Sequence, residues 1–172
     1  TVAEHLNLRE NCGLIDLSAF QIYELEGSGA VEFADYLAVN KIDVPVGRSV
    51  YTPWLNADGG FHSDLTMMRM AEDRVRIVTG VFDGGRDDFW VRKHMPNDGS
   101  VTFTNLSKEI STLGLWGPNA PAVLGQLIDQ DLSQDGSPYG SYLPVTIAGV
   151  ECHLFRISYV GDTGWEIYVP WD

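Results

Sequence analysis

The stretch from Tyr51 to Leu65 has the pattern of a strand, a tight turn and a second strand. Residues such as Tyr51 and Trp54 favour extended backbone because their bulky side chains pack well on a pleated surface. Asp58-Gly59 is a dipeptide typical of hairpin turns, which need positive φ angles. A hairpin joins two antiparallel strands, so this stretch argues against a purely parallel sheet.

The rest of the chain continues this pattern of short strands joined by turns. Strands are predicted at 20–25, 61–70, 74–79, 101–104, 111–116, 143–147, 151–158 and 165–169. Helices are predicted at 2–12, 28–37 and 120–129, with another through 89–91. Because short turns join most strands, the predicted class is α+β, with antiparallel sheets and packed helices rather than alternating βαβ units.

Net charge excludes two classes of partner. The 172 residues include 24 acidic and 11 basic side chains, for a net charge of −13. Such a surface repels phosphate groups, so we expect neither nucleic acid nor a membrane as a partner. No apolar run reaches the roughly 18 residues of a membrane span, and no signal-peptide pattern is present. We expect an enzyme of the cytoplasm or of an organelle matrix, and predict a cytoplasmic one.

The ends of the sequence suggest a piece of a longer protein. The sequence begins at Thr1 without a methionine and stops at Asp172, directly after a predicted strand. Within it we expect a discontinuous first subdomain, residues 1–48 with 110–172, and an inserted second subdomain, residues 49–109.

Common catalytic and metal-binding signatures are absent. The four histidines share no ligand spacing. His62 and Asp64 would share one strand face, but two ligands are fewer than a metal site needs. No nucleophile elbow, convincing Cys–His pair, dinucleotide fingerprint or P-loop occurs. We therefore predict no metal, and expect Cys12 and Cys152 to be buried free thiols.

Two carboxylates stand near turns where backbone can approach a small molecule. Asp64 follows the Gly59-Gly60 pair, and Glu166 lies seven positions after Tyr159, across a glycine-containing turn. Each carboxylate can be an ordinary solvated side chain or the polar anchor of a ligand site. Residue types alone leave both interpretations open.

Four stretches of the chain, taken in order, resemble landmarks of the aminomethyltransferase family. They are Arg9–Ser18, Tyr51–Leu65, Leu115–Ala120 and Arg156–Pro170. This family includes the T-protein of the glycine cleavage system and the tetrahydrofolate-binding modules of dimethylglycine and sarcosine oxidases and dehydrogenases. The resemblance implies the fold of the family's folate-binding region, two antiparallel sheets with helices. We expect the family's C-terminal barrel to lie outside this stretch of sequence.

The resemblance also implies residue roles. Asp64 matches the catalytic aspartate, and Tyr51, Tyr159 and Glu166 match folate-binding residues. A carboxylate such as Glu166 can accept the paired N–H donors of a pterin edge, while tyrosine rings pack on the flat ligand. Asp64 would orient or deprotonate the folate amine that attacks an iminium-like one-carbon unit, and its charge would stabilise the developing cation.

Three further residues are expected to line the pocket: Asn56, Thr79 and Gly80. T-proteins usually carry asparagine where Gly80 stands, and an apolar–acidic pair where His62-Ser63 stands. These departures favour the oxidase and dehydrogenase branch of the family.

The function implied by the resemblance is transfer of a one-carbon unit from an amine or methylated donor to tetrahydrofolate, the expected cofactor. The implied partners are the small-molecule donor and either a flavin domain, fused or associated, or a lipoyl carrier protein. Two alternatives stay open. One is a folate-dependent O- or S-demethylase on the same scaffold. The other is a non-catalytic folate-binding or regulatory module, although iron–sulfur maintenance proteins of this fold carry a cysteine motif that 156–159 lacks.

Overall fold

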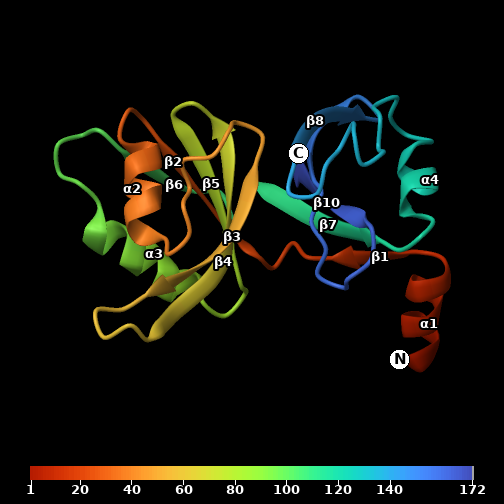
Figure 1. The fold of residues 1–172 in the computed structure, drawn as a ribbon, viewed down its shortest axis with the longest axis horizontal. Coiled ribbons are helices and arrows are strands. Elements are labelled where there is room, and N and C mark those ends of the chain that lie inside the picture. The colour runs from red at the N-terminus through yellow and green to blue at the C-terminus, as the bar shows by residue number, and fades with distance from the viewer. Residues whose placement is uncertain (172) are drawn as a thin grey trace. The chain divides into compact units, whose positions relative to one another are not determined.

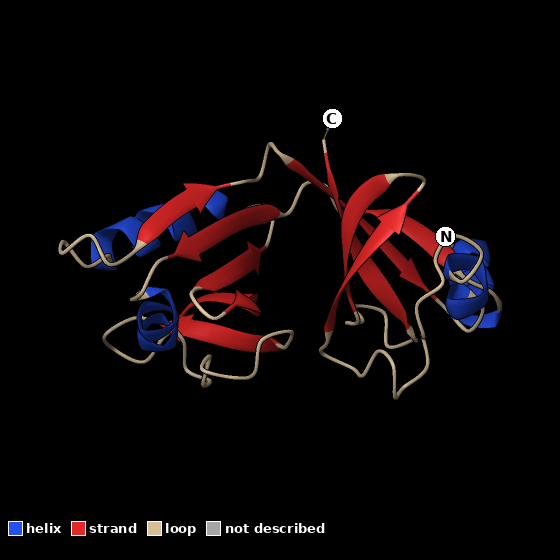
Figure 2. Ribbon diagram, turned by 90° about the horizontal axis from the view of Figure 1, so that it is seen from above, coloured by secondary structure: helices blue, strands red, loops and turns tan. Residues whose placement is uncertain are grey.

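The computed structural model describes residues 1–171 and contains two compact units (Figure 1). Unit 1 comprises Thr1–Ser18 and Glu109–Asp172, and unit 2 comprises Ala19–Lys108. Strands make up most of the regular structure in both units, and the helices are short (Figure 2). Every strand pairing within the described residues is antiparallel, as the turn pattern predicts.

Unit 2 is a five-stranded sheet with two helices packed on it. The strand order is β3-β4-β5-β2-β6. The strands are β2 (Gln21–Glu26), β3 (Ser49–Leu55), β4 (Phe61–Ala71), β5 (Arg74–Thr79) and β6 (Thr102–Asn105). The helices are α2 (Ala30–Leu37) and α3 (Gly84–His94). Apolar residues of both helices join those of the strands in one core, which includes Tyr23, Leu25, Phe33, Trp54, Met67, Ile77 and Val91.

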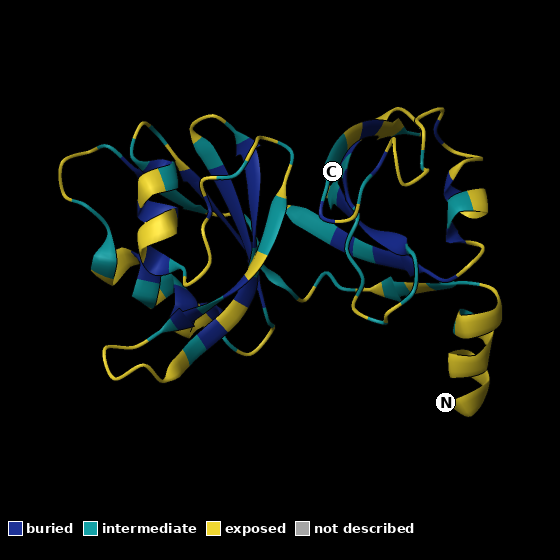
Figure 3. Cartoon of the chain, in the orientation of Figure 1, coloured by how far each residue is buried: buried dark blue, intermediate teal, exposed yellow. Residues whose placement is uncertain are grey.

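Unit 1 is a second five-stranded sheet, with strand order β1-β7-β10-β9-β8. The strands are β1 (Gly13–Asp16), β7 (Ile110–Trp116), β8 (Tyr142–Ile147), β9 (Val150–Phe155) and β10 (Gly164–Pro170). The helices are α1 (Val2–Glu10) and α4 (Ala120–Leu124). None of the residues of α1 is buried, whereas α4 contributes Ala120 and Leu124 to the core (Figure 3).

The central strand of unit 1 separates an apolar face from a mixed one. Trp165 and Ile167 of β10 belong to the core that includes α4. Side chains alternate along a strand, so Glu166 and Tyr168 point to the opposite face. Glu166 is thereby held between two neighbouring strands, opposite Gly114 of β7 and Phe155 of β9.

Several details differ from the predictions, and they include strand β1, which was not predicted. Residues 19–48 lie in unit 2, whereas the prediction grouped 1–48 with 110–172; the reason is that β2 pairs with β5 and β6. Helix α4 ends at Leu124 rather than at Asp129, with Gly125 as its C-cap. Beyond that end, Leu127 is 55% exposed whereas Ile128 is buried.

The two thiols are free, as expected: Cys152 is buried and Cys12 is half-buried. Among the described residues, no helix has the length and apolarity to span a membrane.

Candidate functional site

Tyr51 and Asp64 form a hydrogen-bonded pair on one face of the β3–β4 hairpin. Asp64 lies opposite Pro53 in the strand register, so it is diagonal to Tyr51. The Tyr51 hydroxyl donates to Asp64 Oδ2 at 2.6 Å. Both side chains are exposed, whereas Ser63 and Leu65 on either side of Asp64 are buried. The pair therefore presents an oriented carboxylate on the outer face of the strand.

The turn of this hairpin is organised by Asn56. Its Oδ1 accepts the backbone N–H groups of Asp58 at 3.0 Å and Gly60 at 2.8 Å. Gly59 has a φ of +79°, the left-handed conformation that a side chain disfavours. Asn56 also lines a cavity of ≈ 510 Å³, whose other walls are Tyr36, Leu37, Leu55, Ala57, Asp58, Trp90, Lys93 and His94.

Thr79 and Gly80 lie at the end of β5. Thr79 is buried, and its hydroxyl donates to Asp87 Oδ2 at 2.5 Å, so the hydroxyl is engaged inside unit 2. Gly80 accepts the backbone N–H of Asp83. A Cβ built on Gly80 would meet only Asp83 Oδ2, at 3.5 Å, so a side chain would fit at this position.

Glu166 is buried, with 2% of its surface exposed. Opposite it, Gly114 leaves space that the Trp116 ring fills, because a Cβ on Gly114 would lie 2.1 Å from that ring. Burial raises the pKa of Glu166 to about 7, although a hydrogen bond from the Tyr168 hydroxyl to Oε2 at 2.5 Å opposes the rise. Glu166 is therefore poised between its neutral and charged forms near neutral pH.

Tyr159 lies in the connection between β9 and β10 and is 78% exposed. The connection is fixed on both sides of this residue. Trp116 Nε1 donates to Ile157 O at 2.7 Å, and Arg9 Nη1 bonds Val160 O at 3.2 Å and Asp162 Oδ2 at 2.5 Å. The same connection lines a cavity of ≈ 350 Å³ with Gln134, Tyr139, Arg156, Ser158, Gly161, Thr163 and Gly164.

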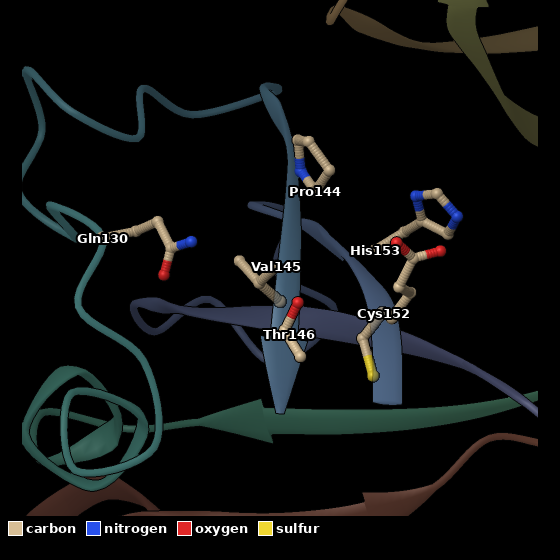
Figure 4. A pocket seen from close by; sticks show the side chains of 7 residues that line it. Gln130, Pro144, Val145, Thr146, Cys152 and His153 are labelled. Carbon is tan, nitrogen blue, oxygen red and sulfur yellow. The ribbon is translucent and has the colours of Figure 1, made fainter. Parts of the chain in front are cut away.

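A third cavity, of ≈ 250 Å³, lies over the β8–β9 hairpin and contains none of the predicted site residues (Figure 4). It is lined by Gln130, Pro144, Val145, Thr146, Glu151, Cys152 and His153. The Cys152 thiol and the His153 ring project in different directions from β9, so they do not form a nucleophile–base pair (Figure 4). Within residues 1–171, no group of three or more His, Cys, Asp or Glu side chains is placed to hold a metal ion.

The structure thus joins Tyr51 to Asp64 by a hydrogen bond within unit 2. In unit 1, Tyr159 lies in the connection that leads into β10, and Glu166 lies on β10 itself. Sequence reasoning missed Tyr168, although its spacing of two from Glu166 on a strand signals a shared face. It also missed Gly114, Ser63 and Asp87. No local pattern marks these residues, because their contacts come from strand register and helix packing.

Comparison with known protein families adds independent evidence. The family model described as the GCVT N-terminal domain matches residues 1–172. An aminomethyltransferase of Listeria monocytogenes serotype 4a (strain HCC23) is 34% identical over 98% of this chain and 46% of its own length. An aminomethyltransferase of Clostridium botulinum (strain Loch Maree / Type A3) is 34% identical over 96% of this chain and 44% of its own length. The chain therefore spans less than half the length of these curated relatives.

Solved structures confirm the predicted α+β fold with its antiparallel sheets. The glycine cleavage system aminomethyltransferase T from Bartonella henselae matches with a TM-score of 0.82 and 28% identity, over 98% of this chain and 44% of that one. The heterotetrameric sarcosine oxidase from Corynebacterium sp. U-96, in complex with pyrrole 2-carboxylate, matches with a TM-score of 0.68. That match covers 98% of this chain and 82% of the other at 16% identity, so it speaks for the fold alone.

Proposed function

Because the chain belongs to the GCVT N-terminal domain family, we propose that it takes part in transferring a one-carbon unit from an amine or methylated donor to tetrahydrofolate. The observation that carries the proposal is the 2.6 Å hydrogen bond from Tyr51 to Asp64. It holds an accessible carboxylate in one orientation at the position that the family resemblance gives to the catalytic aspartate.

Asp64 would act on the reacting amine of the folate. Tyr51 engages Oδ2, which leaves Oδ1 to accept an N–H of the ligand. As the amine nitrogen attacks the iminium carbon, a carbon–nitrogen bond forms, the electron pair of the C=N π bond moves to the donor nitrogen, and the attacking nitrogen loses its proton to the carboxylate. The second folate nitrogen then displaces the donor nitrogen, which leaves as the protonated amine. Before the proton transfer, the negative charge of Asp64 stabilises the cationic carbon.

Glu166 would bind the pterin edge. Its pKa of about 7 means that the free side chain is partly protonated at neutral pH. Paired N–H donors of a ligand favour the charged form, so binding would release a proton from this residue. Tyr159, exposed on a connection that is fixed on both sides, offers a flat ring for ligand contact.

Tetrahydrofolate titration of the complete protein tests the ligand assignment. Replacing Glu166 with glutamine keeps the shape but substitutes a donor for an acceptor, so we expect binding to weaken at least about 10-fold, the equivalent of one charged hydrogen bond. Glu151→Gln is the matched control, because Glu151 is exposed on the neighbouring strand β9. Unchanged binding by Glu166→Gln would show that Glu166 does not hold the pterin.

Turnover separates the enzyme from a binding module. Formation of 5,10-methylenetetrahydrofolate is measured with dimethylglycine and, separately, with an aminomethyl-loaded lipoyl carrier protein as donor. The family resemblance implies a flavin domain in the first case and a carrier partner in the second. Product with either donor supports the proposal, whereas tight folate binding without product from both would favour the non-catalytic module.

A further inference from the structure

Asp87, in the first turn of α3, connects that helix to two neighbouring strands. Its side chain is completely buried. Oδ2 accepts the hydroxyl of Ser63 on β4 at 2.8 Å and the hydroxyl of Thr79 on β5 at 2.5 Å. The two hydroxyl oxygens are themselves 3.4 Å apart. One carboxylate oxygen therefore fixes two strands relative to each other and to the helix.

The start of α3 also contacts a third strand, β2. The Tyr23 hydroxyl on β2 donates to the Gly84 carbonyl at 2.5 Å, and this contact is buried. A Cβ on Gly84 would lie 2.3 Å from the Gln21 side chain, so the helix approaches β2 closely. The position of Asp87 is thus determined by packing against β2, independently of its own hydrogen bonds.

Ser63, the residue of β4 that Asp87 binds, lies directly before Asp64 in the sequence. Because successive strand side chains point to opposite faces, Ser63 points inward where Asp64 points outward. Asp87 holds the inner side through Ser63, and Tyr51 holds the outer side through the Asp64 carboxylate. These two constraints act on adjacent residues from opposite faces of one strand.

A β-bulge brings His62 into the same cluster. Leu55 pairs with Phe61 and Trp54 pairs with Ser63, so His62 is the extra residue. Its ring stacks on Trp90 of α3, with centroids 4.0 Å apart, and Nε2 lies 3.6 Å from Asp87 Oδ1. Burial is the main cause that lowers the pKa of His62, which keeps the ring neutral at neutral pH.

Stability alone does not explain a carboxylate at this position. Asp87 Oδ1 makes no hydrogen bond to a described residue, and Arg86 Nε is 3.7 Å from it. Burying a charge is costly, and well-packed apolar side chains commonly do as well or better in such places. What a carboxylate provides and an apolar side chain lacks is directional bonding to two strands at once.

We propose that Asp87 is a positioning residue for Asp64: by binding Ser63 and Thr79, it fixes the backbone of β4 and β5 so that the Asp64–Tyr51 pair keeps one geometry. This inference rests on the proposed function of Asp64. Catalytic groups must be held to within a fraction of an ångström, and a misplacement of about 1 Å can cost about 100-fold in rate. Asp87 therefore affects the rate of the chemical step while leaving folate affinity nearly unchanged.

The test compares variants of the complete protein at a temperature where each is folded. In Asp87→Ala, we expect kcat to fall about 10- to 100-fold while KM for tetrahydrofolate stays within about threefold. Asp88→Ala is the matched control, since the next carboxylate along α3 pairs with Arg92 at the surface and should leave kcat unchanged. Equal kcat values for Asp87→Ala and Asp88→Ala would overturn the inference.

Thr79 provides a second comparison that does not depend on how well Asp87→Ala folds. Thr79→Val removes the hydroxyl at constant shape and should lower kcat about fivefold, the equivalent of one hydrogen bond. Thr79→Ser keeps the hydroxyl and should restore kcat to nearly the wild-type value. Thr102→Val, on the exposed edge strand β6 of the same sheet, is the control. If the valine and serine variants have the same kcat, the hydroxyl has no positioning role.

A double-mutant cycle with Asp64→Asn separates this inference from the proposed function. If Asp87 acts through Asp64, adding Asp87→Ala or Thr79→Val to Asp64→Asn should change kcat by less than about twofold. Fully additive losses would contradict positioning, because a general structural defect acts whether or not Asp64 is present. If Asp64→Asn alone keeps wild-type turnover, the proposed function fails instead.

Discussion

The Tyr168 hydroxyl donates a 2.5 Å hydrogen bond to Glu166 Oε2, between side chains two residues apart on the same face of β10. This contact opposes the effect of burial, which otherwise drives the carboxyl of Glu166 toward its neutral form. The balance leaves the pKa of Glu166 at about 7. Glu166 can consequently change its charge near neutral pH, and a ligand with paired N–H donors would favour its charged form.

Removing this hydrogen bond should shift the balance further toward the neutral acid. In Tyr168→Phe, the pKa of Glu166 should rise above its wild-type value of about 7, because the contact that favours the charged form is lost. Carbon-13 NMR titration of labelled glutamate side chains measures this directly. A pKa that stays the same or falls in Tyr168→Phe would show that the hydroxyl does not stabilise the carboxylate.

The raised pKa of Glu166 also predicts how the stability of the fold depends on pH. The unfolded chain releases this proton near pH 4.5, whereas the folded chain keeps it up to about pH 7. Between these values the native state binds more protons, so the free energy of unfolding falls as pH rises. The stabilisation is complete below about pH 4.5 and is lost above about pH 7, a change on the order of 3 kcal/mol.

Glutamine at position 166 cannot titrate and should remove this pH dependence. Relative to wild type, Glu166→Gln should become progressively more stable as pH rises from 5 to 8, as measured by urea denaturation. The exposed Glu151→Gln variant should track wild type throughout. A difference between Glu166→Gln and wild type that is constant across this pH range would contradict the assignment.

Gly114 should tolerate no larger residue, since a Cβ there would lie 2.1 Å from the Trp116 ring. Trp116 is fully buried and its Nε1 is bound to Ile157 O at 2.7 Å, so the ring cannot move without breaking that contact. Gly114→Ala should therefore destabilise the fold by about 1 to 3 kcal/mol, as overpacking does. The midpoint of thermal unfolding measures this.

Gly85→Ala is the control for that prediction, because apart from the adjacent residues and the backbone of α3 itself no atom lies within 4 Å of a Cβ built at Gly85. Alanine favours a helix over glycine, so this variant should unfold at the wild-type temperature or slightly above it. Equal unfolding temperatures for Gly114→Ala and wild type would mean that the Trp116 ring relaxes freely.

Much of the local structure around Asp64 was predictable from sequence. Asp58-Gly59 correctly indicates a turn, and alternation in 61–70 indicates a strand on which Asp64 is accessible. Tyr51 and Asp64 are thirteen residues apart, which suits two positions across a short hairpin. The Tyr51–Asp64 contact is made within a single β-hairpin, so local sequence patterns are enough to predict it.

The remaining features depend on contacts between distant segments. Asp87 lies 24 residues after Ser63, and nothing in the intervening sequence indicates that α3 packs its first turn under β4. The pairing of β2 with β5 likewise places residues 19–48 in unit 2, and no signal within that stretch indicates which sheet its strand joins. Residue types alone left open whether Glu166 is solvated, and strand register shows that it is buried between β7 and β9.

The central claim concerns Asp64, and single-turnover kinetics of the complete protein saturated with tetrahydrofolate test it most directly. With folate already bound, the rate of methylenetetrahydrofolate formation reports the chemical step rather than ligand affinity. Asp64→Asn should slow this step at least about 100-fold, and Tyr51→Phe should slow it about 10-fold because the carboxylate loses its orienting hydrogen bond. Asp58→Asn, in the exposed hairpin turn, should react at the wild-type rate. A wild-type single-turnover rate in Asp64→Asn would contradict the account.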